Sequence, residues 1–253
     1  MHPALWYYWP QRWVSFWVQD MRGAPLIVGP GAGLTSQDLE EASARAFSAW
    51  QGEPCTDMQF YYEGITADRS SNMTSDTVNN RNTIIFRYDD WDGTECQEAI
   101  ACTTVVTRRA AGEIIDADID LNLAEHRFVL EPIPESTAFD LQSVLTHEIG
   151  HMLGFDHTQP EHPEAVMWPY ASWGEEATRR ELAIDDVNTL CETYPIGECP
   201  VVNDYGQQAC PEVELAGSCA SATAPKQSDD AWQVALAGLG LVGLAFFAAR
   251  RRL

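Results

Sequence analysis

No stretch of this sequence constrains the chain more than HEIGHMLGFDH, which begins at His147. His147 and His151 are four residues apart, so on a helix both project from one face and can bind the same metal ion. Gly154 allows the chain to leave the helix and turn, which would bring His157 round as a third ligand. Three neutral histidines leave one position of a tetrahedral zinc ion open to water, which is typical of catalytic sites. Glu148 follows the first histidine and can reach that water.

The alternative for this segment is an amphipathic helix that contains histidines for no functional reason. Such a helix would bury three histidines and a glutamate near the core without a metal ion to satisfy them, which costs free energy. The pattern HExxHxxGxxH also fixes more positions than the short HExxH motif, which arises by chance in many chains. We therefore expect one zinc ion, with His147, His151 and His157 as ligands and Glu148 as the catalytic residue.

The spacing of apolar residues predicts both helices and strands. Apolar residues at helical spacing, with Gly or Pro after them, predict three helices at residues 35–51, 140–153 and 184–194. Short stretches rich in β-branched and aromatic residues predict five strands at residues 12–18, 58–62, 83–88, 103–107 and 114–123. Strands interspersed with helices in this way indicate an α+β fold.

The composition divides the chain into three parts. Residues 1–197 hold the three helices and five strands predicted above, residues 198–230 have the Cys, Ser and Ala content of a linker, and a transmembrane tail helix is expected after them. Residues 231–253 form a tail whose apolar run is long enough to span a bilayer, although a buried core helix is the alternative. The tail ends with Arg250, Arg251 and Arg252, which should stay cytoplasmic and leave the rest of the chain outside the cell. Residues 1–18 lack the pattern of a signal peptide, so we expect either an upstream start or another export route.

Charge and cysteine content restrict the partners and the compartment. A net charge of −23 disfavours binding to the phosphate backbone of nucleic acids. Seven cysteines without a CxxC pair favour disulfides in an exported protein over a thiolate zinc site. The pairing cannot be deduced from the sequence. We expect Cys55–Cys191, Cys96–Cys102 and Cys199–Cys210, with Cys219 left over.

A second motif gives the chain its resemblance to a family. The sequence AVMWP at residues 165–169 is similar to the Met-turn of metzincins, in which a methionine, here Met167, lies beneath the zinc-binding histidines. With the zinc-binding motif, it resembles the matrixins, which are the catalytic domains of matrix metalloproteinases and their bacterial relatives. The sequence AFSAW at residues 46–50 and the paired Asp185 and Asp186 before the last helix also resemble matrixins. The resemblance extends over residues 12–195.

The resemblance implies a metzincin fold, with a twisted five-stranded sheet and three helices, and the activity of a zinc endopeptidase. It implies that Asp185 and Asp186 support the Met-turn and the N-terminus of the domain, Asp185 above all, although both can also be charges at a helix start. It also makes a calcium site of Asp116, Asp118 and Asp120 conceivable, the alternative being the solvated face of a half-buried strand.

Three departures from the matrixin pattern matter. No cysteine-switch segment of the PRCGxPD kind precedes the domain in this sequence, so the usual latency mechanism has no visible basis. The histidines that hold a second, structural zinc in animal matrixins are missing before residue 114, which predicts a single zinc. Trp168 stands where matrixins more often have tyrosine, so the wall of the pocket is not defined by the resemblance.

These observations predict an endopeptidase that acts on extracellular proteins. A zinc-activated water would attack the peptide bond, with Glu148 as general base, while the substrate lies extended along the strand at residues 103–107. The first alternative is a catalytically silent surface adhesion module in which zinc is a structural staple. The second is a tail-anchored protein with an ordinary ectodomain and an idle zinc segment.

The tail provides a further expectation about partners and location. A Cys-bearing stretch of small residues, an apolar span and terminal arginines resemble bacterial C-terminal sorting tails of the MYXO-CTERM kind. The resemblance implies a sorting enzyme that acts on the tail, and a final location at the cell surface or outside the cell. Cys219 would then be the residue of interest, although several residues separate it from the apolar span.

Overall fold

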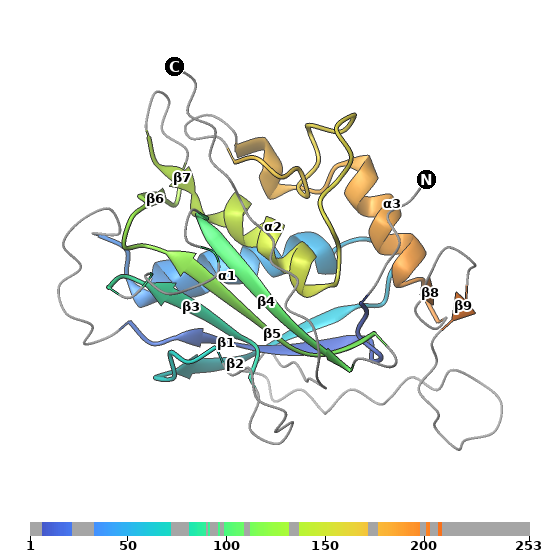
Figure 1. The fold of residues 1–253 in the computed structure, drawn as a ribbon, viewed down its shortest axis with the longest axis horizontal. Coiled ribbons are helices and arrows are strands. Elements are labelled where there is room, and N and C mark those ends of the chain that lie inside the picture. Colours follow the sequence, from blue (N-terminus) through green and yellow to red (C-terminus); the bar gives the residue numbers. More distant parts are fainter. Residues whose placement is uncertain are drawn as a thin grey trace.

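The computed structural model describes residues 7–21, 33–71, 81–89, 91, 96, 99–108, 112–131, 137–171, 177–197, 201–202 and 207–208. The helices are α1 (Ser36–Gln51), α2 (Leu141–Met152), η1 (Ala177–Arg180, a 3-10 helix) and α3 (Ile184–Thr193). The strands are β1 (Trp13–Gln19), β2 (Gln59–Thr66), β3 (Thr83–Arg87), β4 (Ala101–Arg108), β5 (Glu113–Asn122), β6 (Phe128–Val129), β7 (Phe139–Asp140), β8 (Val201–Val202) and β9 (Gln207–Gln208). Figure 1 shows α1 and α2 on one face of the main sheet.

The main sheet is mixed, and its strands are ordered β2-β1-β3-β5-β4. The first four of these run parallel to their neighbours, whereas β4 runs antiparallel to β5. β4 therefore lies at one edge of the sheet, and α2 packs against it. This arrangement confirms the predicted α+β fold with a five-stranded sheet and three α-helices.

The three helices and five strands predicted in residues 1–197 are all present, with ends that shift by a few residues. The largest difference is in β2, which continues past the predicted end at residue 62 to Thr66. Gly64 lies in this extension at φ +111°, and the pairing register with β1 shifts beside it. The short strands β6 to β9 and the helix η1 were not predicted, because elements this short show no periodicity.

Aromatic packing holds α1 on the sheet. Phe47 of α1 stacks on Phe16 of β1 with ring centroids 3.8 Å apart, and it also contacts Phe60 of β2 at 4.8 Å. Trp50 is fully buried at the end of the same helix and donates from Nε1 to the carbonyl of Thr146 in α2, at 2.8 Å. Thr35 caps α1 through a reciprocal hydrogen-bond pair with Asp38, so the predicted start of this helix is confirmed.

The N-terminal residues of the described chain are bound to the ends of α2 and α3. Trp9 is fully buried, and its Nε1 donates to the carbonyl of Met152 at 2.8 Å. The backbone N–H of Trp9 donates to the hydroxyl of Tyr194, which in turn donates to the carbonyl of Leu153 at 2.7 Å. Hydrogen bonds to these carbonyls satisfy acceptors that a helix end otherwise leaves to water.

Two of the three expected disulfides lie within the described residues, and both are present. Cys55–Cys191 joins the segment after α1 to α3, and Cys96–Cys102 closes a short loop before β4. The third expected pair, Cys199–Cys210, and the unpaired Cys219 lie outside the described residues. Disulfides are typical of proteins that fold in oxidising compartments.

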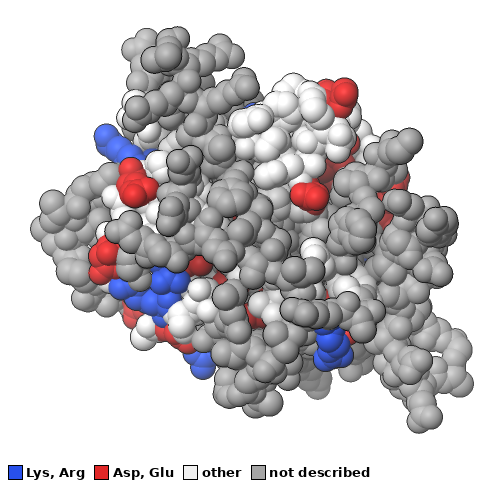
Figure 2. All heavy atoms as spheres, viewed as in Figure 1, with Lys and Arg blue, Asp and Glu red and all other residues white. Residues whose placement is uncertain are grey.

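The predicted linker and tail fall almost entirely outside the described residues, and so do the expected membrane span at 231–249 and the three terminal arginines. Within the part of the chain that the structure describes, no helix has the length and apolar character needed to cross a bilayer. On the face shown in Figure 2, the basic side chains of the described residues lie beside acidic ones. Ion pairs among the described residues include Arg87–Asp120 and Arg69–Asp89.

We predict that the two disulfides differ in their effect on stability. The residues of Cys55–Cys191 are separated by 136 positions in the sequence, and those of Cys96–Cys102 by 6. By loop-closure entropy, replacing the first pair by serine should lower the free energy of unfolding by about 5 kcal/mol, and replacing the second by about 2 kcal/mol. Urea unfolding of the two double variants measures this, and equal losses would contradict the entropic argument.

Candidate metal centre

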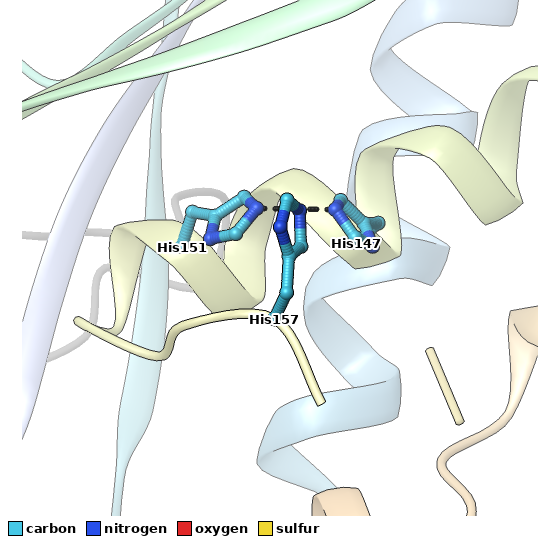
Figure 3. A group of neighbouring side chains, drawn as sticks. All are labelled: His147, His151 and His157. Carbon is cyan, nitrogen blue, oxygen red and sulfur yellow. Dashed lines mark hydrogen bonds between the residues drawn. The ribbon is translucent and has the colours of Figure 1, made fainter. Parts of the chain in front are cut away.

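Three histidines converge beneath the sheet, as shown in Figure 3. One ring nitrogen from each of His147, His151 and His157 lies within 4.8 Å of the others. His147 and His151 are buried, and His157 is partly exposed. Among the described residues, this is the only group of three or more His, Cys, Asp or Glu side chains with the spacing of a metal site.

The local fold brings the third histidine to the first two as the sequence predicts. α2 presents His147 and His151 one turn apart, and the helix ends at Leu153. Gly154 then takes φ +91°, which L side chains rarely adopt, and the chain reverses towards His157. A Cβ at Gly154 would lie 2.3 Å from the carbonyl oxygen of Tyr7, so the close approach of the N-terminal segment also requires glycine here.

Backbone carbonyls decide which nitrogen of each helical histidine is unprotonated. Nδ1 of His147 lies 2.6 Å from the carbonyl oxygen of Val166, and Nδ1 of His151 lies 2.8 Å from that of Phe155. A carbonyl oxygen can only accept, so each Nδ1 carries the hydrogen and each Nε2 is left with its lone pair. Metal-binding histidines are oriented in the same way, by a hydrogen bond from the other ring nitrogen.

The distance between the two unprotonated Nε2 atoms indicates whether a metal ion fits. Nε2 of His147 and Nε2 of His151 are only 3.1 Å apart. With both protons on Nδ1, this contact brings two lone pairs together and is repulsive unless a cation lies between them. Nε2 of His157 is buried and has no hydrogen-bond partner in the part of the chain that the structure describes. This set of three neutral nitrogen donors fits zinc.

Burial disfavours the charged form of each of these groups. Burial, helped by the neighbouring histidines, lowers the pKa of His147 well below its usual range and that of His151 to about 3. Burial also lowers the pKa of His157. The pKa of Glu148 is raised to about 8 by burial, against which hydrogen bonds from Thr103 act. Neutral histidines are the form that binds metal ions.

Glu148 lies next to the histidines and is held by the edge strand. Its side chain is fully buried, and its Oε2 accepts a hydrogen bond of 2.5 Å from the hydroxyl of Thr103 in β4. Its Oε1 is buried and has no hydrogen-bond partner among the described residues. Thr103 therefore fixes Oε2, and Oε1 is available to accept a further hydrogen bond. The sequence predicted Glu148 but not its contact with Thr103, because a threonine in a strand carries no distinguishing signal.

Met167 packs directly against the helix that carries the two histidines. A Cβ at Gly150, which lies between these histidines in α2, would be 2.2 Å from Sδ of Met167. Only a residue without a side chain therefore permits this approach. Met167 is nearly buried, at 3 % exposure.

Asp186 fixes the turn that contains Met167. Its Oδ2 accepts hydrogen bonds from the backbone N–H groups of Val166 and Ala183, and its Oδ1 accepts from that of Met167. These three bonds join the start of α3 to the residue whose carbonyl orients His147. From the sequence we expected this role for Asp185 above all, but in the structure Asp186 makes these contacts.

Asp185 lies on a different side of the turn. It accepts a hydrogen bond from the hydroxyl of Thr158, and His162 lies 3.7 Å from it. It also lines a pocket of about 260 Å³, together with Met167, other residues of α3 and residues on both sides of the third histidine in the sequence. Asp185 thus contacts the segment after His157 and makes no hydrogen bond to the turn at Met167.

The three aspartates expected to bind calcium do not converge on one site. Oδ1 of Asp118 accepts from the backbone N–H of Thr83 at 2.8 Å, and Oδ1 of Asp120 pairs with Arg87 at 2.6 Å. Asp116 is buried and its two oxygens have no partner among the described residues, and burial raises its pKa to about 8. Asp118 and Asp120 therefore bind other residues of the sheet, and calcium binding stays a prediction.

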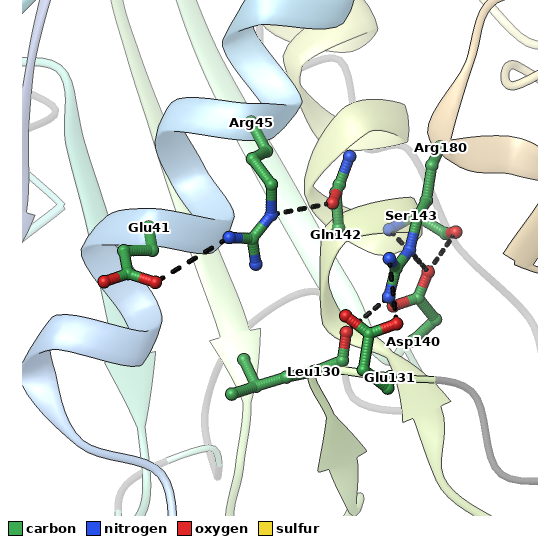
Figure 4. A network of polar contacts seen from close by, with 8 residues as sticks. All are labelled: Glu41, Arg45, Leu130, Glu131, Asp140, Gln142, Ser143 and Arg180. Carbon is green, nitrogen blue, oxygen red and sulfur yellow. Dashed lines mark hydrogen bonds and ion pairs between the residues drawn. The ribbon is translucent and has the colours of Figure 1, made fainter.

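A polar network that the sequence did not predict fixes the N-terminal end of α2 (Figure 4). Asp140 caps the helix, and Arg180 of η1 donates to both of its carboxylate oxygens at 2.8 Å. Arg45 of α1 donates to Oε1 of Gln142 at 3.0 Å. These contacts join three helices at the end of α2 that precedes His147. Arginines separated this far in sequence from their partners give no local signal.

Comparison with known proteins agrees with this geometry. The family model described as Matrixin matches residues 27–195. Metalloendoproteinase 5-MMP from Arabidopsis thaliana is 26% identical over 181 residues, which are 70% of this chain and 45% of that protein. Metalloendoproteinase 1-MMP from the same plant is 28% identical over 163 residues, or 64% of this chain and 39% of that protein. Metalloendoproteinase 1 from Glycine max is 40% identical over 63 residues, or 25% and 19%. The chain spans less than half the length of each of these relatives.

We predict that Asp186→Asn weakens the protein more than Asp185→Asn does. Asparagine has one accepting oxygen, so its NH₂ group must face at least one of the three N–H donors that the carboxylate now satisfies. The expected loss in the free energy of unfolding is about 2–3 kcal/mol. Denaturant unfolding of both variants measures it, and equal effects would show that the three bonds at Asp186 contribute little.

Proposed function

Because the chain belongs to the matrixin family, we propose that it is a zinc-dependent endopeptidase that hydrolyses peptide bonds of extracellular proteins. The observation that carries this proposal is the pair of unprotonated Nε2 atoms of His147 and His151, 3.1 Å apart, with a third free nitrogen from His157 beside them. A buried carboxylate next to three such donors is what hydrolysis requires in addition to a metal site.

The three histidines would hold the zinc ion. When bound, zinc supplies a Lewis acid that polarises the scissile carbonyl and makes water acidic enough to attack it near neutral pH. Glu148 then has the role of general base. Its Oε1, which is free of protein partners among the described residues, accepts a proton from the attacking water and delivers it to the nitrogen of the leaving amine.

The edge strand β4 offers a place for the substrate backbone. Its hydrogen-bonding groups on one side pair with β5, and no described strand pairs with its other side. An extended peptide can add to such an edge as a further strand, which aligns its backbone for cleavage. β4 also packs against α2, which carries the two helical histidines, so a peptide on this edge would run beside the metal centre.

The alternative is a zinc-stapled binding module without catalytic activity. A structural staple needs only the three ligands, and the burial of a further carboxylate beside them costs free energy that such a staple does not require. Glu148 is fully buried, and one of its oxygens lacks a partner among the described residues. This observation favours the catalytic proposal.

Export is part of the same proposal. The two disulfides are consistent with a protein that folds in an oxidising compartment. Anchoring by the predicted tail span at residues 231–249, with its arginines in the cytoplasm, and the action of a sorting enzyme on that tail remain predictions from the sequence.

We predict that Glu148→Gln abolishes cleavage without loss of the metal. Glutamine keeps the shape of glutamate but cannot take a proton, so the rate of peptide cleavage should fall by about 100- to 10,000-fold. The measurement is cleavage of a quenched peptide library by the full zinc-loaded chain, with zinc content determined for each protein.

The matched control is Glu181→Gln, because Glu181 is exposed and lies outside the metal centre. It should cleave like the wild type. If the wild type and E148Q both hold one zinc ion and neither cleaves any peptide, the catalytic proposal is wrong and the binding module takes its place.

A further inference from the structure

We propose that Thr103 is a positioning residue for the general base: its hydroxyl holds Oε2 of Glu148 and thereby keeps Oε1 oriented for proton transfer. This inference rests on the proposed function. It assigns a role to a residue outside the zinc-binding motif and outside the turn at Met167.

The contact between the two residues is short and completely enclosed. Oγ1 of Thr103 lies 2.5 Å from Oε2 of Glu148, which is the length expected of a hydroxyl that donates to a carboxylate. Both side chains have 0 % exposure, so water does not compete for either oxygen. Oγ1 also lies 3.1 Å from the backbone carbonyl oxygen of Glu148, which is a second, more distant acceptor for the same hydroxyl hydrogen.

The strand itself does not require a hydroxyl at this position. Side chains alternate between the faces of a strand, so Ala101, Thr103 and Val105 share the face of β4 that is turned towards α2. Ala101 and Val105 are apolar and belong to the main core cluster. A third apolar residue would suit that core equally well, since a buried hydroxyl costs free energy unless it has a partner. Glu148 is the partner that makes threonine favourable here.

The two carboxylate oxygens of Glu148 are thereby given different roles. Oε2 is bound by Thr103, and Oε1 has no partner among the described residues. A carboxylate without the first contact can rotate about its terminal bond or leave its rotamer, and either movement misplaces the second oxygen. Small errors in the position of a catalytic group reduce rates strongly, because the reacting atoms must already be aligned. A rigid donor on a sheet strand is a direct means of preventing such errors.

The test compares three variants of the full chain. Thr103→Val replaces the hydroxyl by a methyl group of similar size, Thr103→Ser restores the hydroxyl, and Thr103→Ala replaces Thr103→Val if that protein does not fold. The matched control is Thr193→Val, since Thr193 is also fully buried and its hydroxyl donates to a carbonyl within α3, away from the site. Steady-state cleavage of a quenched peptide, zinc content and thermal unfolding are measured for each protein.

We expect T103V to bind one zinc ion and to show a kcat about 10- to 100-fold lower than that of the wild type, with KM changed less than about threefold. T103S should recover most of the lost kcat. T193V should lose stability to a similar extent as T103V but keep its kcat. The inference is overturned if T103V keeps a kcat within about twofold of the wild type, or if T103S is no better than T103V.

A second measurement separates failure of this inference from failure of the proposed function. If the wild type cleaves no peptide, the proposed function is wrong, and crystal structures of the wild type, T103V and T103S then decide the role of Thr103. The inference predicts one orientation of the Glu148 carboxylate in the wild type and T103S, and a different or divided orientation in T103V. An unchanged carboxylate in T103V would show that other contacts position it.

Discussion

Two unprotonated imidazole nitrogens, on His147 and His151, face each other across 3.1 Å inside this protein. Their protons are held on the far side of each ring by the carbonyls of Val166 and Phe155. Moving one of these protons to Nε2 would relieve the repulsion, but it would leave the carbonyl of Val166 or of Phe155 buried without its donor, which costs free energy. The centre therefore fits a cation, and much of the surrounding structure keeps the two rings in place.

That support comes from parts of the chain that are distant in sequence. Val166, whose carbonyl orients His147, is itself held through its N–H by Asp186 at the start of α3. Met167 packs against α2 at the point where Gly150 leaves space for its sulfur. At the other end of the helix, Arg180 and Arg45 bind residues that precede the first histidine. These contacts hold α2 at both ends and fix the turn at Met167, so the two helical histidines take their positions from rigid elements.

How much of this could be predicted from the sequence depended on the range of the interaction. The histidine motif, the capping of α1 by Thr35 and the strands rich in β-branched residues are local patterns, and the structure has each of them. Contacts between residues that are far apart in the sequence could not be predicted in this way. The spacing of Asp185 and Asp186 could not show which carboxylate meets the turn at Met167, since a helix start presents adjacent residues in different directions. The pairing of Asp118 with Thr83 and of Asp120 with Arg87 likewise depends on strand order, which no local pattern records.

The position of β1 has a practical consequence for dissecting this protein. The match to the matrixin family begins at residue 27, yet β1 ends at Gln19 and lies between β2 and β3 in the main sheet. A chain trimmed to the limits of the family match would lose the strand that joins β2 to the rest of the sheet. It would also lose Trp9, which binds the end of α2. A fragment cut there would lack both parts, so inactivity of such a fragment would carry no information about the metal centre.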